Sequence, residues 1–191
     1  MSVVVYTLFL IAVGLGRLAE MGISRRHQRA MAARGATKIA EPHFRWMVLL
    51  HGGVLVGAAL EVWLLARPFI PALAIPMFVL FVLSNMLRWW VIRTMAEHWN
   101  VQVVNSLELG VVTSGPFRWI RHPNYLAVFV ELLAVPLIHT AWLTALLGGL
   151  AHVEVLRRRI AVEEAVLLAN PNYRVAMGHK PRFIPRVGRD A

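Results

Sequence analysis

Two short polar clusters interrupt an otherwise apolar chain. Residues 121–125 read Arg-His-Pro-Asn-Tyr, and Arg159, Glu163 and Glu164 follow further along the sequence. Proline suits the first turn of a helix, where its missing N–H costs nothing, and it pushes the preceding histidine towards an extended conformation. The free N–H groups of that turn, beside an arginine, favour an anion such as a carboxylate. If both clusters lie on the same side of a membrane, they can build one site.

Each cluster also has a simpler interpretation. The basic turn is typical of an anchor at a membrane interface, with its tyrosine as the interfacial aromatic. Arg159 and Glu163 are four residues apart, which an ordinary salt bridge on a helix explains. Glu164 has no cationic side chain at the corresponding spacing. The two adjacent carboxylates do not lie on one stripe of a helix, so we expect one of them to point inward.

The composition indicates a membrane protein. Hydrophobic residues make up 58% of the 191 residues, against about 45–50% in a soluble domain. The chain has no cysteine, which excludes disulfides, thiolate metal sites and a cysteine nucleophile, and no metal site is expected. The net charge of +10 is carried almost entirely by arginine. We expect these charges to bind anionic membrane lipids and not nucleic acid.

A membrane span needs about 20 helical residues. Four apolar segments of the chain are candidates for such spans. The first runs from Val3 to Leu18 or Ala19, and the next two are Trp46–Leu65 and Phe69–Leu87. The fourth segment, Tyr125–Ala151, is open to two interpretations: one long helix kinked at its proline, or two short spans joined at residues 137–140.

The distribution of positive charge favours the hairpin. With a hairpin, 19 of the 20 Lys and Arg residues fall on the cytoplasmic side, all except Arg67, as the positive-inside rule requires. The sequence therefore predicts an all-α polytopic protein with about five transmembrane helices, the last two forming a short hairpin. We expect the N-terminus outside, the C-terminus inside, and both polar clusters on the cytoplasmic face, in the inner membrane of a bacterium.

Ionisable residues within the spans are further candidates, since they are costly in a membrane and usually face the bundle interior. His51 lies inside the second span, and we weigh a substrate-binding role against a structural one. Glu61 lies near the outer end of that span, where we expect a structural role. Glu131 lies inside the fourth segment above the His122 turn, as a candidate ligand for a cation. Trp89, at the end of the third span, is an interfacial aromatic that we assign to the substrate side.

At these residues the chain resembles the isoprenylcysteine carboxyl methyltransferase family of integral membrane enzymes. The matching features are residues 115–125, then Glu131, then Arg159 with Glu163 and Glu164. Tyr173 and residues 182–185 also fit. The broader group includes phospholipid methyltransferases, and some sterol reductases share similar C-terminal elements.

The N-terminal half resembles one bacterial branch more closely. Residues 25–35, then 41–44, then His51 are similar to enzymes that methylate alkylpyrones or alkylresorcinols made by type III polyketide synthases. The resemblance implies a lipophilic or prenylated acceptor, either the carboxyl group of an isoprenylcysteine or an alkylpyrone or alkylresorcinol hydroxyl. The alternatives are a phospholipid N-methyltransferase, a reductase with a nicotinamide cofactor, and a lipid-binding scaffold without activity.

The resemblance also implies S-adenosylmethionine as the methyl donor, and it assigns roles to individual residues. Arg159 and Glu164 are the expected catalytic residues, with Arg159 orienting the nucleophile. The expected cofactor-binding residues are Arg121, His122, Pro123, Tyr125, Glu131, Glu163, Glu164 and Tyr173.

The chemistry would be an in-line transfer of a methyl group from sulfonium to oxygen, whose main demand is positioning. Aromatic faces and carboxylates suit the sulfonium cation. An arginine-rich site favours an oxygen nucleophile that is already ionised, because such a group needs no base. We expect one domain over residues 1–191, with three spans in residues 1–95. The catalytic loop, the helical hairpin and the cofactor-binding tail would occupy residues 96–191.

Overall fold

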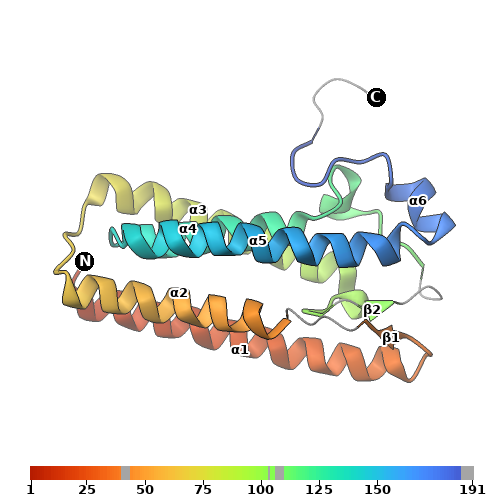
Figure 1. The fold of residues 1–191 in the computed structure, drawn as a ribbon, viewed down its shortest axis with the longest axis horizontal. Helices are drawn as coiled ribbons and strands as arrows, with labels where there is room; N and C mark the ends of the chain where they lie inside the picture. Colours follow the sequence, from red (N-terminus) through yellow and green to blue (C-terminus); the bar gives the residue numbers. More distant parts are fainter. Residues whose placement is uncertain (40–43, 103, 106–109, 186–191) are drawn as a thin grey trace.

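The computed structural model describes residues 1–39, 44–102, 104–105 and 110–185, and five long helices lie side by side in it (Figure 1). Their bounds are α1 Val3–Ala32, α2 Phe44–Leu64, α3 Pro71–Met95, α4 Pro123–Leu137 and α5 Trp142–Leu167. Shorter elements follow or join them: the 3₁₀ turns η1 Ala96–His98 and η3 Gly115–Arg118, the helix α6 Pro171–Met177, and the two-residue strands β1 Thr37–Lys38 and β2 Val104–Asn105. The strands pair antiparallel.

Three of the described helices, α1, α2 and α3, are long and apolar enough to cross a membrane. The shorter apolar helix α4 joins α5 through a turn at residues 138–141, where the hairpin was predicted. Leucine, valine and tryptophan side chains are exposed along the outer faces of these helices, as a lipid environment allows. The protein is therefore a helical membrane protein, and the count of five spans stays a prediction.

Two helices continue beyond the ends of the predicted spans. The helix α1 continues to Ala32 and α3 continues to Met95, well past the charged residues at which the apolar runs stop. The reason is that Glu20 of α1 and Arg88 of α3 are both buried and form an ion pair with each other. A charge that is neutralised inside the bundle does not end a helix. The second span was predicted to within two residues of α2.

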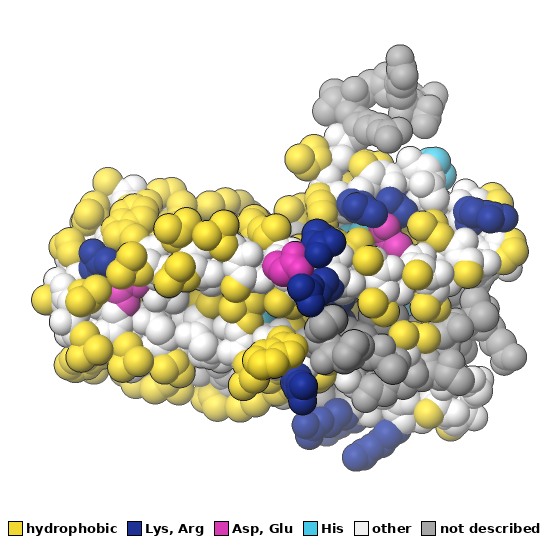
Figure 2. Space-filling model, in the orientation of Figure 1, with side chains coloured by type: hydrophobic (Ala, Val, Ile, Leu, Met, Phe, Trp, Pro, Cys, Tyr) yellow, Lys and Arg dark blue, Asp and Glu magenta, His cyan; other side chains and the backbone are white. Residues whose placement is uncertain are grey.

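Most connections that carry polar residues gather at one end of the bundle. Residues 110–122 and the tail from α6 to residue 185 lie together at the right of Figure 1, with β1 and β2 below them. In Figure 2 most visible Lys and Arg side chains lie towards this end, while hydrophobic side chains cover the rest of the bundle. The two polar clusters therefore share one end of the molecule, which is called the polar end below. Residues 41–43, part of the resemblance to the bacterial branch, lie outside the described residues.

Glu61 has the structural role that its position suggested. Its carboxylate accepts hydrogen bonds from the backbone N–H groups of Leu143 and Thr144, at 3.1 and 2.7 Å, and from the Thr144 hydroxyl at 2.8 Å. It also pairs with Arg67. These N–H groups belong to the first turn of α5, and N–H groups in the first turn of a helix have no partner within that helix. Glu61 therefore caps α5 and ties the end of the hairpin to α2.

Close packing of α5 against α2 depends on Gly148. A Cβ atom built at Gly148 would lie 2.6 Å from Cγ2 of Val54, whereas one built at Gly53 on α2 meets nothing within 4 Å. We expect Gly148→Ala to lower the free energy of unfolding by about 1–3 kcal/mol, the usual cost of overpacking. Gly53→Ala is the matched control and is expected to change it little. Thermal unfolding in detergent tests both, and equal midpoints for the two variants would contradict this packing.

Candidate functional site

Glu164 is the centre of the polar end. Its carboxylate is buried and accepts hydrogen bonds from Nε2 of His122 at 3.0 Å and from Nε and Nη2 of Arg182 at 3.1 and 2.6 Å. Nη2 of Arg121 lies 3.2 Å from the same carboxylate. One side chain of α5 therefore holds together the turn before α4 and the tail after α6.

The charge on Glu164 is stabilised by its partners. Burial alone would raise the pKa of this carboxyl, but the hydrogen bonds from Arg182 and His122 and the charge of Arg121 outweigh it and hold the pKa below its ordinary value of 4.5. Because the folded-state pKa is depressed, the stabilisation by Glu164 is present above the ordinary value and is lost as the pH falls through the folded-state pKa. The cluster is therefore intact at neutral pH.

Tyr125 connects the second carboxylate to Arg159. Its hydroxyl donates a hydrogen bond to Glu163 and accepts one from Nε of Arg159 at 2.7 Å. The Arg159 guanidinium lies over the Tyr125 ring, 5.4 Å from the centroid, and also donates to the backbone carbonyl of Val101. The Tyr125 ring stacks on His122, with 5.3 Å between the centroids. The predicted carboxylates thus contact the predicted turn through two adjacent sets of hydrogen bonds.

The tail closes over the turn through its backbone. The N–H groups of Arg121 and His122 donate to the carbonyls of Pro181 and Arg182, at 2.9 and 3.0 Å. The prediction that His122 is extended is wrong, since its ψ angle is 55°. The physical reason is that its N–H is tied to the tail while its ring is tied to Glu164. This position places the ring at the start of α4.

Two buried polar atoms beside the turn have no hydrogen-bond partner in the described part of the chain. They are Nε of Arg121, a donor, and Oδ1 of Asn124, an acceptor. Buried polar groups normally find a partner. In addition, no described side chain caps the N-terminus of α4, where free N–H groups and the helix dipole favour an anion. These features fit a bound ligand with both anionic and donor groups.

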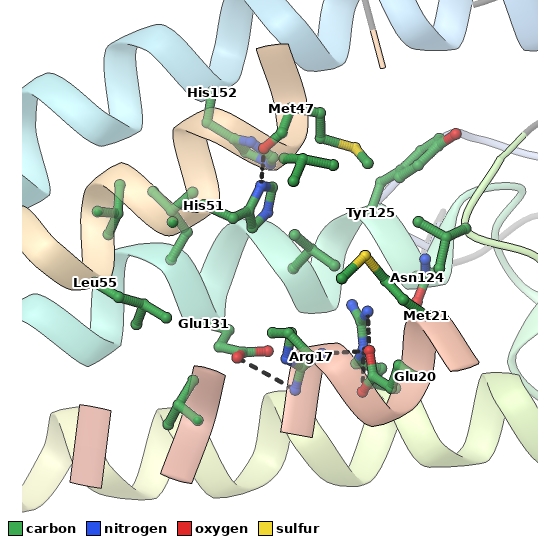
Figure 3. A pocket seen from close by; sticks show the side chains of 18 of the residues that line it. Arg17, Glu20, Met21, Met47, His51, Leu55, Asn124, Tyr125, Glu131 and His152 are labelled. Atoms are coloured by element: carbon green, nitrogen blue, oxygen red, sulfur yellow. Dashed lines mark hydrogen bonds and ion pairs between the residues drawn. The ribbon is translucent and has the colours of Figure 1, made fainter. Parts of the chain in front are cut away.

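A cavity of about 360 Å³ lies between the five long helices and reaches the site from within the bundle. Figure 3 shows His51, Tyr125, Glu131 and His152 around it. Tyr125 and Arg159 line the cavity as well as the polar cluster. Most of the remaining wall is aliphatic. The arrangement therefore offers an apolar chamber whose polar end meets the tyrosine and the arginine.

A second set of charges forms part of the cavity wall. Arg17 and Arg88 both pair with Glu20, and Arg17 also lies 3.3 Å from Glu131 (Figure 3). Arg88 directly follows the end of the third predicted span, and this group was not predicted. Charges within a membrane are usually paired and functional. The sequence signal for this group was the position of Arg17, Glu20 and Arg88 at the edges of apolar runs.

Removing one member of this group has a large expected cost. Breaking a buried ion pair leaves an unpaired charge and typically costs about 3–5 kcal/mol. We therefore expect Glu20→Gln to lower the free energy of unfolding by about that amount, measured by chemical denaturation in detergent. The exposed Glu97, which pairs with Arg34 on the surface, provides the control, and Glu97→Gln is expected to leave stability unchanged. Similar losses for the two variants would refute the importance of the buried pair.

The remaining predicted residues are placed as follows. Pro123 is buried at the first position of α4. Tyr173 packs beside the apolar cluster around Trp99 and Met177, where burial and the nearby Glu163 raise the pKa of its phenol. Glu131 lies nine residues after His122 in the sequence, and its partner is Arg17. The structure does not bring Trp89 to the cavity, because its side chain is 44% exposed on the outer face of α3.

The described residues contain no group of three or more histidine and acidic side chains arranged to hold a metal ion. Arg182 contacts Glu164, a role that was not predicted for it. The signal for it was the match of residues 182–185 to the family's ending, but the pairing with Glu164 depends on how the tail folds back.

Comparison with known proteins matches residues 76–169 to the isoprenylcysteine carboxyl methyltransferase family. An uncharacterized protein of Bacillus subtilis strain 168, YpbQ, is 28% identical over 152 residues, which cover 79% of this chain and 89% of the relative. An uncharacterized protein of Haemophilus influenzae is 29% identical over 152 residues, covering 79% and 88%.

Among solved structures, the eukaryotic intramembrane Ras methyltransferase, an isoprenylcysteine carboxyl methyltransferase, has a similar fold. The TM-score is 0.54 at 23% identity, and the match covers 72% of this chain but only 50% of that enzyme. The chain thus spans about half the length of the solved relative. All the residues that contact Glu164 or Glu163 from the turn and from α4 lie within the matched family segment.

Proposed function

Because this chain belongs, through residues 76–169, to the isoprenylcysteine carboxyl methyltransferase family, we propose that it is an S-adenosylmethionine-dependent O-methyltransferase. Its acceptor is lipophilic: the carboxyl group of an isoprenylcysteine or the hydroxyl of an alkylpyrone or alkylresorcinol. The observation that carries this proposal is the junction of two different environments at Tyr125 and Arg159. A charged cluster lies on one side of them and an apolar cavity on the other.

The charged side suits the methyl donor. S-adenosylmethionine supplies a methyl group on a sulfonium, together with a carboxylate and an ammonium group. The unpartnered Nε of Arg121 and the uncapped start of α4 provide donors for a carboxylate. Glu163, which accepts a hydrogen bond from Tyr125, provides negative charge for a cation. Glu164 keeps these elements together, so its role here is to assemble the cofactor pocket.

The apolar side suits the acceptor. The cavity is walled by aliphatic residues of α1, α2, α4 and α5, so a hydrocarbon chain can lie there without exposing itself to water. Arg159 is a fixed cation at the mouth between the two sides, and it orients an ionised oxygen towards the methyl group. For an acceptor oxygen that is already ionised, such as a carboxylate or an acidic enol, positioning of this kind supplies much of the rate enhancement. A resorcinol hydroxyl must also release its proton as it takes the methyl group.

The same arrangement fixes the expected location of the reaction. A water-soluble cofactor reaches the polar end from the cytoplasm, and the lipid acceptor reaches the cavity from the bilayer. We therefore place the site at the cytoplasmic face of a bacterial inner membrane, with the N-terminus outside and the C-terminus inside. Residues 1–191 act as one domain in this proposal, because helices from both halves line the cavity.

Calorimetric binding of S-adenosylhomocysteine, the reaction product, tests the proposal. We expect micromolar binding to the detergent-purified protein and at least about tenfold weaker binding to His122→Ala, since that variant loses the link to Glu164 and the stacking on Tyr125. The outer-surface variant Trp89→Ala serves as the control and is expected to bind as tightly as the wild type. A folded, monodisperse wild-type protein that fails to bind would count against the methyltransferase proposal.

A further inference from the structure

His152 is buried in the bundle with both ring nitrogens unsatisfied. Its side chain on α5 is 2% exposed, it lines the cavity, and neither Nδ1 nor Nε2 has a hydrogen-bond partner in the described structure. The ring is held in place by stacking on Phe129, with 6.1 Å between centroids. An imidazole that is fixed, buried and unpaired at a cavity wall is costly. A ligand that pairs with it would remove that cost.

His51 lies opposite on α2 and completes a pair. The two ring centroids are 5.2 Å apart and the rings are perpendicular. Nδ1 of His51 is 2.7 Å from the carbonyl of Met47. Because a carbonyl only accepts, this nitrogen carries the proton, and in the neutral ring Nε2 is left as an acceptor.

The pair thus presents a mixed set of groups. Three arginines but only two glutamates line the cavity, so we take both histidines as neutral. Neutral His152 has one N–H donor and one acceptor nitrogen in either tautomer, and His51 adds an acceptor. A hydroxyl matches this set because it can donate to one ring and accept from the other. A carboxylate only accepts and would meet the lone pair of His51.

The pair lies deeper in the bundle than Arg159. On α5, His152 and Arg159 are seven residues apart, or two turns along one face, about 10 Å at 1.5 Å per residue. On α2, His51 is one turn from Met47, whose sulfur contacts Arg159. A group bound between the histidines is therefore not the oxygen that Arg159 orients. It belongs to a part of the acceptor that extends further into the cavity.

We propose that His51 and His152 form a hydrogen-bonding subsite for a hydroxyl group of the lipid acceptor, in addition to the oxygen that receives the methyl group. This inference rests on the proposed function and narrows its acceptor class to lipids that carry two oxygen functions near one end. An acceptor with a single carboxylate followed directly by hydrocarbon would leave the pair unsatisfied.

The test compares two probes that differ by one hydroxyl, 5-pentadecylresorcinol and 3-pentadecylphenol. Binding of each to the detergent-purified protein is measured by calorimetry. We expect the wild type to bind the resorcinol at least about tenfold more tightly, because a site built to hydrogen-bond a hydroxyl rejects the analogue that lacks it. In His152→Phe, which keeps a ring to stack on Phe129, the ratio should fall towards one. His152→Gln, which keeps a donor and an acceptor, should recover part of it.

The combination of His51→Leu with His152→Phe refines the test. If both rings bind one hydroxyl, the loss in the double variant should be smaller than the product of the two single losses. An unchanged ratio in His152→Phe, or no preference for the resorcinol in the wild type, would overturn the subsite and assign the nitrogens to trapped water. Binding of S-adenosylhomocysteine is measured on the same variants. If the protein binds S-adenosylhomocysteine but shows no preference for the resorcinol, the subsite fails and the proposed function stands. If it prefers the resorcinol but does not bind S-adenosylhomocysteine, the proposed function fails and the subsite stands.

Discussion

Glu164→Gln is expected to weaken binding of S-adenosylhomocysteine by about 100-fold or more. The substitution removes a buried negative charge that two arginines, Arg121 and Arg182, and the His122 ring share. Cations left buried without a partner typically cost about 3–5 kcal/mol, and about 1.4 kcal/mol corresponds to a tenfold change in affinity. Because this carboxylate is the side-chain link from α5 to both the turn and the tail, the cofactor pocket should lose the support of one of its walls. Calorimetry at neutral pH measures the effect.

Glu154→Gln is the matched control for this experiment. Glu154 lies on the same helix, one turn before Arg158, and forms exposed ion pairs with Arg157 and Arg158. Surface pairs of this kind contribute little, so the variant should bind like the wild type. If Glu164→Gln folds and binds S-adenosylhomocysteine with unchanged affinity, the cluster is not the cofactor site.

Arg159→Ala is expected to lower kcat by about 100-fold while changing the affinity for S-adenosylhomocysteine less than threefold. Removing one group that stabilises the reacting oxygen costs about 10²–10³ in rate in other enzymes. Arg159 lines the cavity and donates a hydrogen bond to the Tyr125 hydroxyl, so its loss should affect the oxygen of the acceptor more than the binding of the cofactor. Transfer of labelled methyl groups to the extracted lipid, at saturating cofactor, gives kcat.

Arg158→Ala controls for the loss of an arginine from the same helix. Arg158 is half exposed and pairs with Glu154 on the surface, so its loss should leave kcat unchanged. Arg159→Lys adds a second comparison, because an ammonium keeps the charge but lacks the planar fork that contacts both Tyr125 and a backbone carbonyl. A rate for Arg159→Ala equal to that of Arg158→Ala would remove Arg159 from the reaction.

The family and the helical fold could be predicted because they depend on local sequence. The match to the family model covers residues 76–169, which include His122 and both glutamates, and apolar runs of sufficient length indicate helices. The positive-inside rule also predicted correctly that the turn and Glu164 share one end, since a hairpin was needed to keep the basic tail on the same side.

The charged wall of the cavity could not be predicted in the same way. The predicted spans stop at Leu18 or Ala19 and at Leu87, just before Glu20 and Arg88, whereas the structure pairs these two side chains inside the bundle. Their pairing depends on the relative rotation of α1 and α3, which no local pattern specifies. The role of Arg182 was missed for a similar reason, because a tail's return path is set by tertiary contacts. Trp89 was assigned to the substrate side but is exposed on the outer face of α3. An aromatic residue at the end of a span faces outward as readily as inward, so its position in the sequence did not determine its direction.

Transfer of a labelled methyl group from S-adenosylmethionine to lipid is the most direct test of the account. The purified protein is incubated with the labelled cofactor and a bacterial lipid extract, and the label in the organic phase is counted for the wild type and for Arg159→Ala. We expect label to appear in a single lipophilic product with the wild type and to fall about 100-fold with the variant. Label that stays in the water phase with the wild type, although the protein binds S-adenosylhomocysteine, would contradict methyl transfer to a lipid.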